Sequence, residues 1–245
     1  MKHNRLYNDL AQWFPVLTPP EEYAEEARQW RDVLREKLGP GRHRILELGV
    51  GGGHNLSHLT GEFDATAVDL SPAMLEHCRR LNPTVDCHEG DMRSVRLGRT
   101  FDAVLIHDAV SYLLSEDDIR ATLATANAHL RSGGALLMAP DDFRETFTDH
   151  EICHSKHGAG SSHLTYIEYT HDPDPSDTSI ESVMFFLIRR DGQLTIEQDR
   201  HMLGLFSQTR WLELMRQSGF SAEKRSYALE AGSQWHMLIG VVQGH

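Results

Sequence analysis

A short apolar run followed by closely spaced glycines is the feature that most constrains the fold of this chain. Residues 44–48 read Arg-Ile-Leu-Glu-Leu, glycines occupy positions 49 and 51–53, and a helical stretch follows near residues 55–59. A buried strand that runs directly into glycines and a helix is typical of nucleotide-binding sheets, because glycine permits a tight turn and lets the backbone approach a ligand. We therefore expect a sheet built around this strand.

The same alternation of strand and helix continues along the chain. Ser71-Pro72 is typical of a helix start, and Ser115 with Asp118 forms the pattern of a capping box. Strands that alternate with helices imply a parallel sheet with helices on both faces. After the first strand, the sequence predicts strands over residues 65–69, 85–88, 101–106 and 135–138, and helices over residues 21–38, 73–81 and 115–130.

After Pro140 the alternation stops. Three extended segments, residues 162–170, 180–189 and 194–201, are joined by turn sequences and indicate an antiparallel meander. A last helix over residues 208–218 and two further strands complete the chain. We therefore expect the α/β class: a Rossmann-like, mostly parallel seven-stranded sheet with an antiparallel three-strand meander inserted after strand five.

The spacing of the glycines distinguishes between two cofactors. A dinucleotide fingerprint would need glycines at positions 49, 51 and 54, but residue 54 is His, which disfavours a nicotinamide oxidoreductase. The chain instead has Glu47-x-Gly49-x-Gly51-x-Gly53. This pattern resembles motif I of the class I methyltransferases, whose methyl donor is S-adenosylmethionine.

Three later segments resemble that family in the same order. Asp69 ends the second strand, where a carboxylate can accept from both ribose hydroxyls. By resemblance, Asp91 would accept from the adenine amino group, and Leu70 and Met92 would flank the ring. The segment Phe101-Asp-Ala-Val-Leu-Ile-His-Asp108 resembles the fourth-strand motif, whose end lies under the methionine part.

The candidate catalytic residues follow from topology, since ligands lie beyond the carboxyl ends of parallel strands. His107, Asp108 and Tyr112 follow the fourth strand, and Asp141 and Asp142 follow the fifth. We expect His107 or Asp108 to accept a proton or to orient the nucleophile, and His107 also to contact the cofactor. Methyl transfer itself depends mainly on alignment and on exclusion of water.

The meander and the first residues favour a small acceptor molecule. Both resemble amino-sugar N-methyltransferases and glycine N-methyltransferases, and the resemblance places Tyr7 over the methionine part, although simple packing against its aromatic neighbours is an equal alternative. An amine or hydroxyl of a small molecule is the expected acceptor, with an amino sugar as first guess and a homodimer as the implied oligomer. Tyr166, Glu168, Tyr169, Phe185 and His201 are candidates to line a substrate pocket, with only half of them on any one face.

That resemblance divides the chain into four expected parts. They are an N-terminal helical lid segment over residues 1–41, an S-adenosylmethionine-binding core over 42–140, the meander as a substrate or dimer element over 141–206, and the last helix with strands six and seven over 207–245. An S-adenosylmethionine-binding protein without transferase activity is the alternative that intact cofactor motifs leave open.

Charge and composition exclude several other classes. The formal net charge of −12 would repel a phosphate backbone, so nucleic acid is a poor candidate partner. No apolar run is long enough for a membrane span, no secretory signal is visible, and three cysteines make no disulfide framework. We expect a cytoplasmic protein without membrane contact.

One cluster of metal-binding residue types stands outside this scheme. His150, Cys153, His154 and His157 have spacings that would line one face of a helix, which is compatible with zinc. The cluster lacks a standard paired spacing, and 16 histidines in the chain make chance clustering plausible. We expect no metal site.

Overall fold

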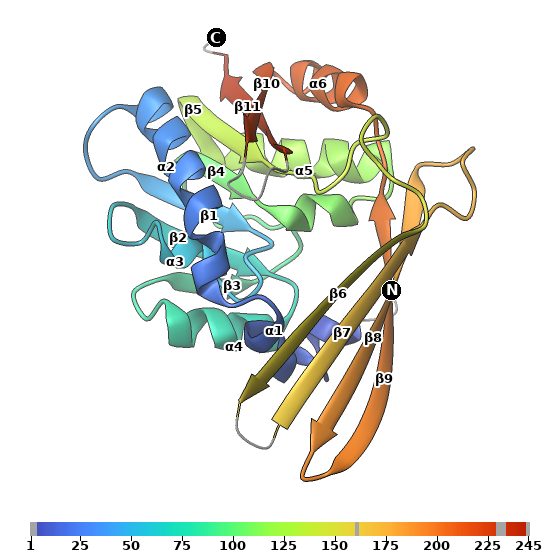
Figure 1. Ribbon diagram of the computed structural model, residues 1–245. Helices are drawn as coiled ribbons and strands as arrows, with labels where there is room; N and C mark the ends of the chain where they lie inside the picture. The colour runs from blue at the N-terminus through green and yellow to red at the C-terminus, as the bar shows by residue number, and fades with distance from the viewer. Residues whose placement is uncertain (1–3, 160–161, 229–233, 244–245) are drawn as a thin grey trace.

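The computed structural model describes residues 4–159, 162–228 and 234–243 (Figure 1). No helix within these ranges is long and apolar enough to cross a membrane. The α-helices are α1 (Phe14–Leu17), α2 (Ala24–Leu38), α3 (His54–Ser57), α4 (Pro72–Leu81), α5 (Glu116–His129) and α6 (Gln208–Gln217), and the 3-10 helices include η1 (Arg5–Tyr7) and η4 (Asp108–Tyr112). The strands are β1 (Arg44–Leu48), β2 (Asp64–Asp69), β3 (Asp86–Glu89), β4 (Phe101–Ile106), β5 (Leu130–Met138), β6 (Glu151–Ala159), β7 (Ser162–His171), β8 (Ser179–Arg190), β9 (Gln193–Gly204), β10 (Phe220–Ala228) and β11 (Gln234–Val242).

The strands form two sheets within the described ranges. One has the order β10-β11-β5-β4-β1-β2-β3, and the other has the order β6-β7-β8-β9. Pairs among β1 to β5 are parallel, whereas β11 pairs antiparallel with both β5 and β10. The predicted class, a Rossmann-like and mostly parallel seven-stranded sheet, is confirmed.

The chain order of the strands reverses between β1 and β4. From β1 the chain adds β2 and β3 on one side, and it then returns to place β4 and β5 on the other. In open parallel sheets, ligands bind beyond the carboxyl ends of the strands at such a switch point. The glycine turn leaves β1 at this place.

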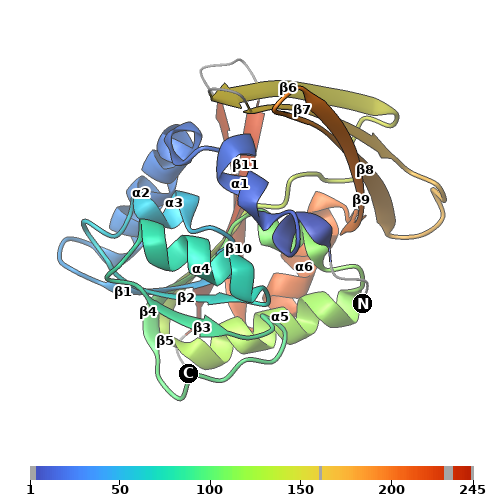
Figure 2. The same cartoon turned by 90° about the horizontal axis from the view of Figure 1, so that it is seen from below.

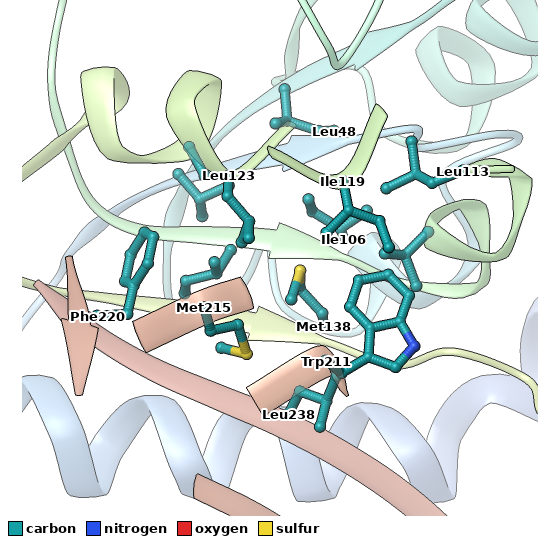
Figure 3. Close-up of a cluster of buried hydrophobic side chains, with 14 of the residues drawn as sticks. Leu48, Ile106, Leu113, Ile119, Leu123, Met138, Trp211, Met215, Phe220 and Leu238 are labelled. Atoms are coloured by element: carbon teal, nitrogen blue, oxygen red, sulfur yellow. The ribbon is translucent and has the colours of Figure 1, made fainter. Parts of the chain in front are cut away.

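Different helices cover the two faces of the seven-stranded sheet (Figure 2). α5 and α6 lie on one face, where Ile119 and Trp211 pack against Ile106 and Met138 (Figure 3). α2, α3 and α4 lie on the opposite face, where Trp30 is fully buried. Each such side chain contributes about 1.5–3 kcal/mol when it is removed from water, so the two cores hold the strand ends in place.

The inserted sheet has one strand more than the sequence predicts. β6 pairs antiparallel with β7, with Glu151 opposite Thr170, and makes the meander four-stranded. β6 is an exposed edge strand, and its polar sequence lacks the apolar alternation by which strands are found. The predicted helical face around Cys153 is therefore wrong, because successive side chains of a strand point to opposite faces. In the described ranges, no group of three or more His, Cys, Asp or Glu residues is arranged to hold a metal ion.

The N-terminal segment packs between the two sheets (Figures 1 and 2). Leu6, Leu10 and Trp13 share a buried cluster with Met184 and Phe186 of β8. These apolar contacts fix the first turns of the chain against the inner face of the four-stranded sheet, which also positions the polar residues beside them.

We predict that Phe186→Ala loosens this contact. Phe186 is fully buried, so its truncation should lower the free energy of unfolding by about 3–5 kcal/mol and speed amide exchange in residues 5–17. Ile196 lies on the neighbouring strand and is 62% exposed, so Ile196→Ala is the matched control, with an expected change within about 0.5 kcal/mol. Equal effects of the two substitutions would contradict this packing.

Candidate functional site

The turn after β1 holds three glycines with positive φ. Gly49, Gly51 and Gly53 have φ of 74°, 55° and 75°, a region that glycine adopts readily because it lacks a Cβ. A Cβ at Gly49 would lie 2.3 Å from the Cβ of Ala109 in the loop after β4. The close packing of this loop therefore also requires glycine at position 49. The N–H of Gly49 donates to the carbonyl oxygen of Val68 at 2.8 Å and ties the turn to the end of β2.

Asp69 ends β2 beside this turn. Its Oδ2 accepts from the N–H of Gly51 at 2.8 Å, and its Oδ1 accepts from the N–H of Ser71 at 2.8 Å. Burial raises the pKa of Asp69, against the opposing effect of these hydrogen bonds. The next residue, Leu70, is 55% exposed. A carboxylate held beside an open apolar side chain fits ribose hydroxyls and the face of an adenine ring.

Glu47 is a buried acid at the end of β1. It is 2% exposed, and its Oε2 has no hydrogen-bond partner among the described residues. Burial raises its pKa to about 8; His107 opposes this shift, and Asp108 adds to it. A buried carboxyl without a partner is costly, so this oxygen is suited to pair with the ammonium group of a ligand.

Asp91 and Met92 follow β3 and close another side of the turn. Both carboxylate oxygens of Asp91 accept from Arg93, at 3.0 Å from Nε and 2.6 Å from Nη2, and this guanidinium lowers the pKa of Asp91. A Cβ at Gly49 would lie 3.0 Å from Cε of Met92. Arg93 thus occupies much of the hydrogen-bonding capacity of Asp91. The bond predicted from an adenine amino group to Asp91 stays a prediction.

His107 lies between two carboxylates. Its Nε2 is 2.8 Å from Oε2 of Glu26, and its Nδ1 is 2.7 Å from Oδ1 of Asp108. Burial alone lowers the pKa of His107, but the two carboxylates outweigh it and raise the pKa well above its usual range. A charged imidazole with both nitrogens bonded has no free site for another proton. Its catalytic and cofactor-binding roles stay predictions, and this geometry favours orienting Asp108.

A chain of hydrogen bonds joins three distant parts of the sequence. The hydroxyls of Tyr7 and Tyr112 are 2.7 Å apart, and the Tyr112 hydroxyl is 2.7 Å from Nδ1 of His201. Nε2 of His201 is 2.8 Å from Oδ2 of Asp199, which also accepts from the N–H of Leu6 at 2.7 Å. The N-terminal segment, η4 and β9 therefore meet at the two tyrosines.

Tyr7 and its neighbour Phe14 connect the N-terminal segment to the region of the glycine turn. The hydroxyl of Ser71 donates to the carbonyl oxygen of Tyr7, and the ring of Tyr7 packs edge-on against Phe14, with centroids 6.0 Å apart. Cζ of Phe14 would lie 3.8 Å from a Cβ at Gly51. The N-terminal segment thus covers the turn on the side that faces the four-stranded sheet.

Acidic groups gather around the tyrosine pair. Asp141 follows β5, and its N–H donates to Oγ of Ser111 at 3.0 Å. The surrounding protein and the charge of Asp108 raise the pKa of Asp141 well above its usual range, although solvent still reaches this residue. Burial also raises the pKa of Tyr112, with further contributions from Tyr7, Asp141 and Glu168 of β7. Such a site favours a cation over an anion.

The structure brings most predicted site residues together. Glu47, the glycines, Asp69 and Leu70 lie around one turn, and Tyr7 and Tyr112 meet beside it. Among the meander candidates, Tyr166, Glu168 and His201 lie on the inner face, whereas Tyr169 and Phe185 alternate to the other face. Glu26 and Asp199 were missed. Glu26 reaches His107 across 81 residues, whereas Asp199 lies two residues before His201 on the same strand, a spacing that could have indicated the pair.

Comparison with known proteins identifies methyltransferases that are similar to this chain. A family model described as a methyltransferase domain matches residues 45–134. A dTDP-3-amino-3,4,6-trideoxy-α-D-glucopyranose N,N-dimethyltransferase of Streptomyces venezuelae is 39% identical over 131 residues, which cover 53% of this chain and about half, 55%, of that protein. A dTDP-3-amino-3,6-dideoxy-α-D-glucopyranose N,N-dimethyltransferase of Streptomyces fradiae is 26% identical over 84% of this chain and 88% of its own.

Solved structures show the same architecture over the whole chain. The Streptomyces venezuelae protein DesVI superposes with a TM-score of 0.82 at 26% identity, covering 96% of this chain and 97% of its own. A sugar N-methyltransferase from Streptoalloteichus superposes with a TM-score of 0.84 at 24% identity, covering 100% of this chain and 95% of its own.

The fold and the glycine turn define a Rossmann-like protein that binds a nucleoside-containing ligand at its switch point. Residues 45–134 match a methyltransferase domain, and the chain is similar to methyltransferases that use S-adenosylmethionine as methyl donor. The residues present fit that cofactor: the unpartnered oxygen of Glu47 suits its ammonium group, Asp69 suits its ribose, and the open side chain of Leu70 suits its adenine.

We predict that Gly49→Ala damages the cofactor turn through a steric clash. The φ of 74° and the contact with Ala109 should together cost about 1–3 kcal/mol and weaken S-adenosylhomocysteine binding at least about tenfold, measured by calorimetry. Adding Ala109→Gly removes the clash but not the backbone strain, so it should restore part of the loss. Gly61→Ala, which meets nothing within 4 Å, should be neutral. No recovery in the double variant would contradict the proposed clash.

We also predict that cofactor binding releases a proton from Glu47. Its pKa of about 8 keeps this acid largely protonated at pH 7, and a bound ammonium group would favour the carboxylate. Binding of S-adenosylhomocysteine, measured by calorimetry at pH 7 in buffers of different ionisation enthalpy, should release close to one proton. Glu47→Gln should bind more weakly and lose this release; an unchanged release would refute the assignment.

Proposed function

We propose that this protein transfers methyl groups from S-adenosylmethionine to the amino group of a nucleotide-linked amino sugar. The relatives that align over most of the chain support this proposal. The Streptomyces fradiae protein and a Saccharopolyspora spinosa protein, 26% identical over 82% of this chain, are both described as N,N-dimethyltransferases of dTDP-amino sugars. We therefore propose an amine as the methyl acceptor, rather than either an amine or a hydroxyl.

The observation that carries the proposal is the acidic surrounding of the tyrosine pair. Asp108, Asp141 and Glu168 all act on Tyr7 or Tyr112 through their charges. An amino sugar is a cation near neutral pH, and such a site attracts it. The amine must then lose a proton before its nitrogen can attack, so an acidic group with a raised pKa is well suited to receive that proton.

We assign that step to Asp141. Its pKa is raised well above the usual range of an aspartate by the surrounding protein first and by Asp108 second. In its charged form it can accept a proton from the substrate ammonium group. Bound S-adenosylmethionine supplies a methyl group on a sulfonium, and the amine nitrogen takes that methyl while the sulfur keeps the bonding electrons. Tyr7 and Tyr112 hold the nitrogen in line for this displacement.

Three further expectations belong to the same proposal. Residues 1–41 act as a lid segment: Phe14 lies beside the glycine turn, and Tyr7 bonds to Ser71 after β2. The division at residues 140 and 206 separates a cofactor-binding core from a substrate element. The protein acts as a homodimer in the cytoplasm on a small molecule.

The proposal is tested by incubating the protein with S-adenosylmethionine and a dTDP-3-amino-3,6-dideoxyglucose. Mass spectrometry should show the sugar nucleotide gaining one and then two methyl groups. The corresponding sugar nucleotide with a hydroxyl in place of the amine is the matched control and should gain none. Tight cofactor binding without transfer to any amine would instead favour a cofactor-binding protein without transferase activity.

We predict that Asp141→Asn lowers turnover by about 10²–10⁴-fold at neutral pH. In the unmodified protein, turnover should fall on the acid side as Asp141 becomes protonated, at a pH above the usual titration range of aspartate. The variant should lack this acid limb. Asp142→Asn is the neighbouring control: the charge of Asp142 contributes to the raised pKa of Asp141, so this variant should keep the acid limb but move it to lower pH. Equal pH profiles of both variants would contradict the assignment of Asp141.

A further inference from the structure

A buried Asp–His pair stands behind the two tyrosines and has no part in the mechanism described so far. His201 has no exposed surface, and Asp199 is 7% exposed. Both ring nitrogens of His201 are engaged, Nε2 by Asp199 at 2.8 Å and Nδ1 by the hydroxyl of Tyr112 at 2.7 Å. The hydroxyl of Tyr7, 2.7 Å from that of Tyr112, ends the chain on the side of the acidic residues.

The direction of these hydrogen bonds follows from the protonation state of Asp199, the group at the buried end of the hydrogen-bond chain. Burial raises the pKa of Asp199, but the hydrogen bonds from His201 and from the N–H of Leu6 outweigh this effect and hold the pKa below its usual value. Asp199 is therefore a carboxylate, which can only accept. Nε2 of His201 must carry the proton, and in a neutral imidazole Nδ1 is then an acceptor.

The same reasoning gives the direction of the other hydrogen bonds. Because Nδ1 of His201 accepts, the hydroxyl of Tyr112 must donate to it. The oxygen of Tyr112 then accepts the hydroxyl hydrogen of Tyr7, and the oxygen of Tyr7 is left with lone pairs only. Each hydroxyl has a single hydrogen to donate, so the orientation of one fixes the next.

We infer that Asp199 and His201 are positioning residues that make the Tyr7 oxygen an acceptor for an N–H of the attacking amine. This inference rests on the proposed function. An amine that donates an N–H to Tyr7 keeps its lone pair free to attack the methyl carbon. If the chain ran the other way, the hydroxyl of Tyr7 would donate to that lone pair and block the displacement.

The pair also makes this orientation depend on the N-terminal segment. Oδ2 of Asp199 accepts both from Nε2 of His201 and from the backbone N–H of Leu6, the residue before Tyr7. Arg5 bonds to Glu197 of the same strand at 2.9 Å. The acceptor oxygen of Tyr7 is thus fixed only when the segment that carries it is docked on β9.

The test compares two substitutions of similar size at His201. Asn carries an oxygen near the position of Nδ1 that can accept from Tyr112, whereas Leu has none. At pH 8, His201→Leu should lower kcat at least about tenfold with S-adenosylhomocysteine affinity within about twofold. His201→Asn should keep kcat within about threefold. Equal kcat values for the two variants would overturn the inference.

A control separates this effect from the general loss of a buried histidine. His129 is 1% exposed and hydrogen-bonded through both nitrogens near Phe101, at the opposite end of β4 from Tyr112. His129→Leu should lower the melting temperature but leave kcat unchanged. A fall in kcat equal to that of His201→Leu would overturn the inference.

A second measurement uses the unmodified protein and does not depend on methyl transfer. Nitrogen-15 NMR of histidine-labelled protein bound to S-adenosylhomocysteine at pH 8 reports which ring nitrogen of His201 carries the proton. Protonation at Nε2 alone is expected, and a proton on Nδ1 would overturn the inference. Failure of the unmodified protein to methylate any amino sugar would instead contradict the proposed function and leave the NMR result standing.

Discussion

The contact between the N-terminal segment and the inner face of the four-stranded sheet is the interaction on which the proposed site depends. Leu6 is buried in an apolar cluster with Phe186, and its N–H donates to Asp199. The next residue, Tyr7, bonds through its carbonyl to Ser71, whose N–H donates to Asp69 beside the cofactor turn, and through its hydroxyl to Tyr112. One short segment therefore links the cofactor turn, the end of β4 and the inserted sheet.

The seven-stranded sheet supplies the other half of the site. Because its strand order reverses between β1 and β4, the glycine turn and the loop with Asp108 open at the same edge. The close approach of Ala109 to Gly49 brings these two loops into contact. In the proposed function, the buried acid Glu47 pairs with the cofactor, and the more accessible acids Asp108 and Asp141 attract the cationic acceptor.

The sequence predicted the parts of the fold that depend on local pattern. β1 and β4 have their predicted bounds, since continuous apolar runs between turn residues define buried strands. β6 was missed, because an exposed polar edge strand carries no such pattern. The hydrogen bond from the N–H of Leu6 to Asp199 could not be predicted, since a pairing across 193 residues depends on how the sheets are placed. The spacing of Asp199 and His201 on one strand could have indicated that pair.

For the site as well, features that depend on local sequence were easier to predict than features that depend on distant residues. Spacing and the resemblance to motif I predicted Glu47 and the glycines of one strand–turn–helix unit, and Asp69 at the end of the second strand, as cofactor-binding residues. The structure places Asp69 beside that turn. The role of His107 was harder to predict, since its partner Glu26 comes from α2, 81 residues earlier. Glu26 is a charge partner from a distant element, which no local pattern records, whereas Asp108 is the next residue in the sequence.

The central claim is that the amine is held by the Tyr7 hydroxyl beside the transferring methyl group. A crystal structure with S-adenosylhomocysteine and a dTDP-amino sugar tests it most directly. The account predicts that the amino nitrogen lies within hydrogen-bond distance of the Tyr7 hydroxyl, with the cofactor sulfur on its opposite side from the sugar carbon. A sugar nucleotide bound with its amine away from Tyr7 and Asp141 would contradict it.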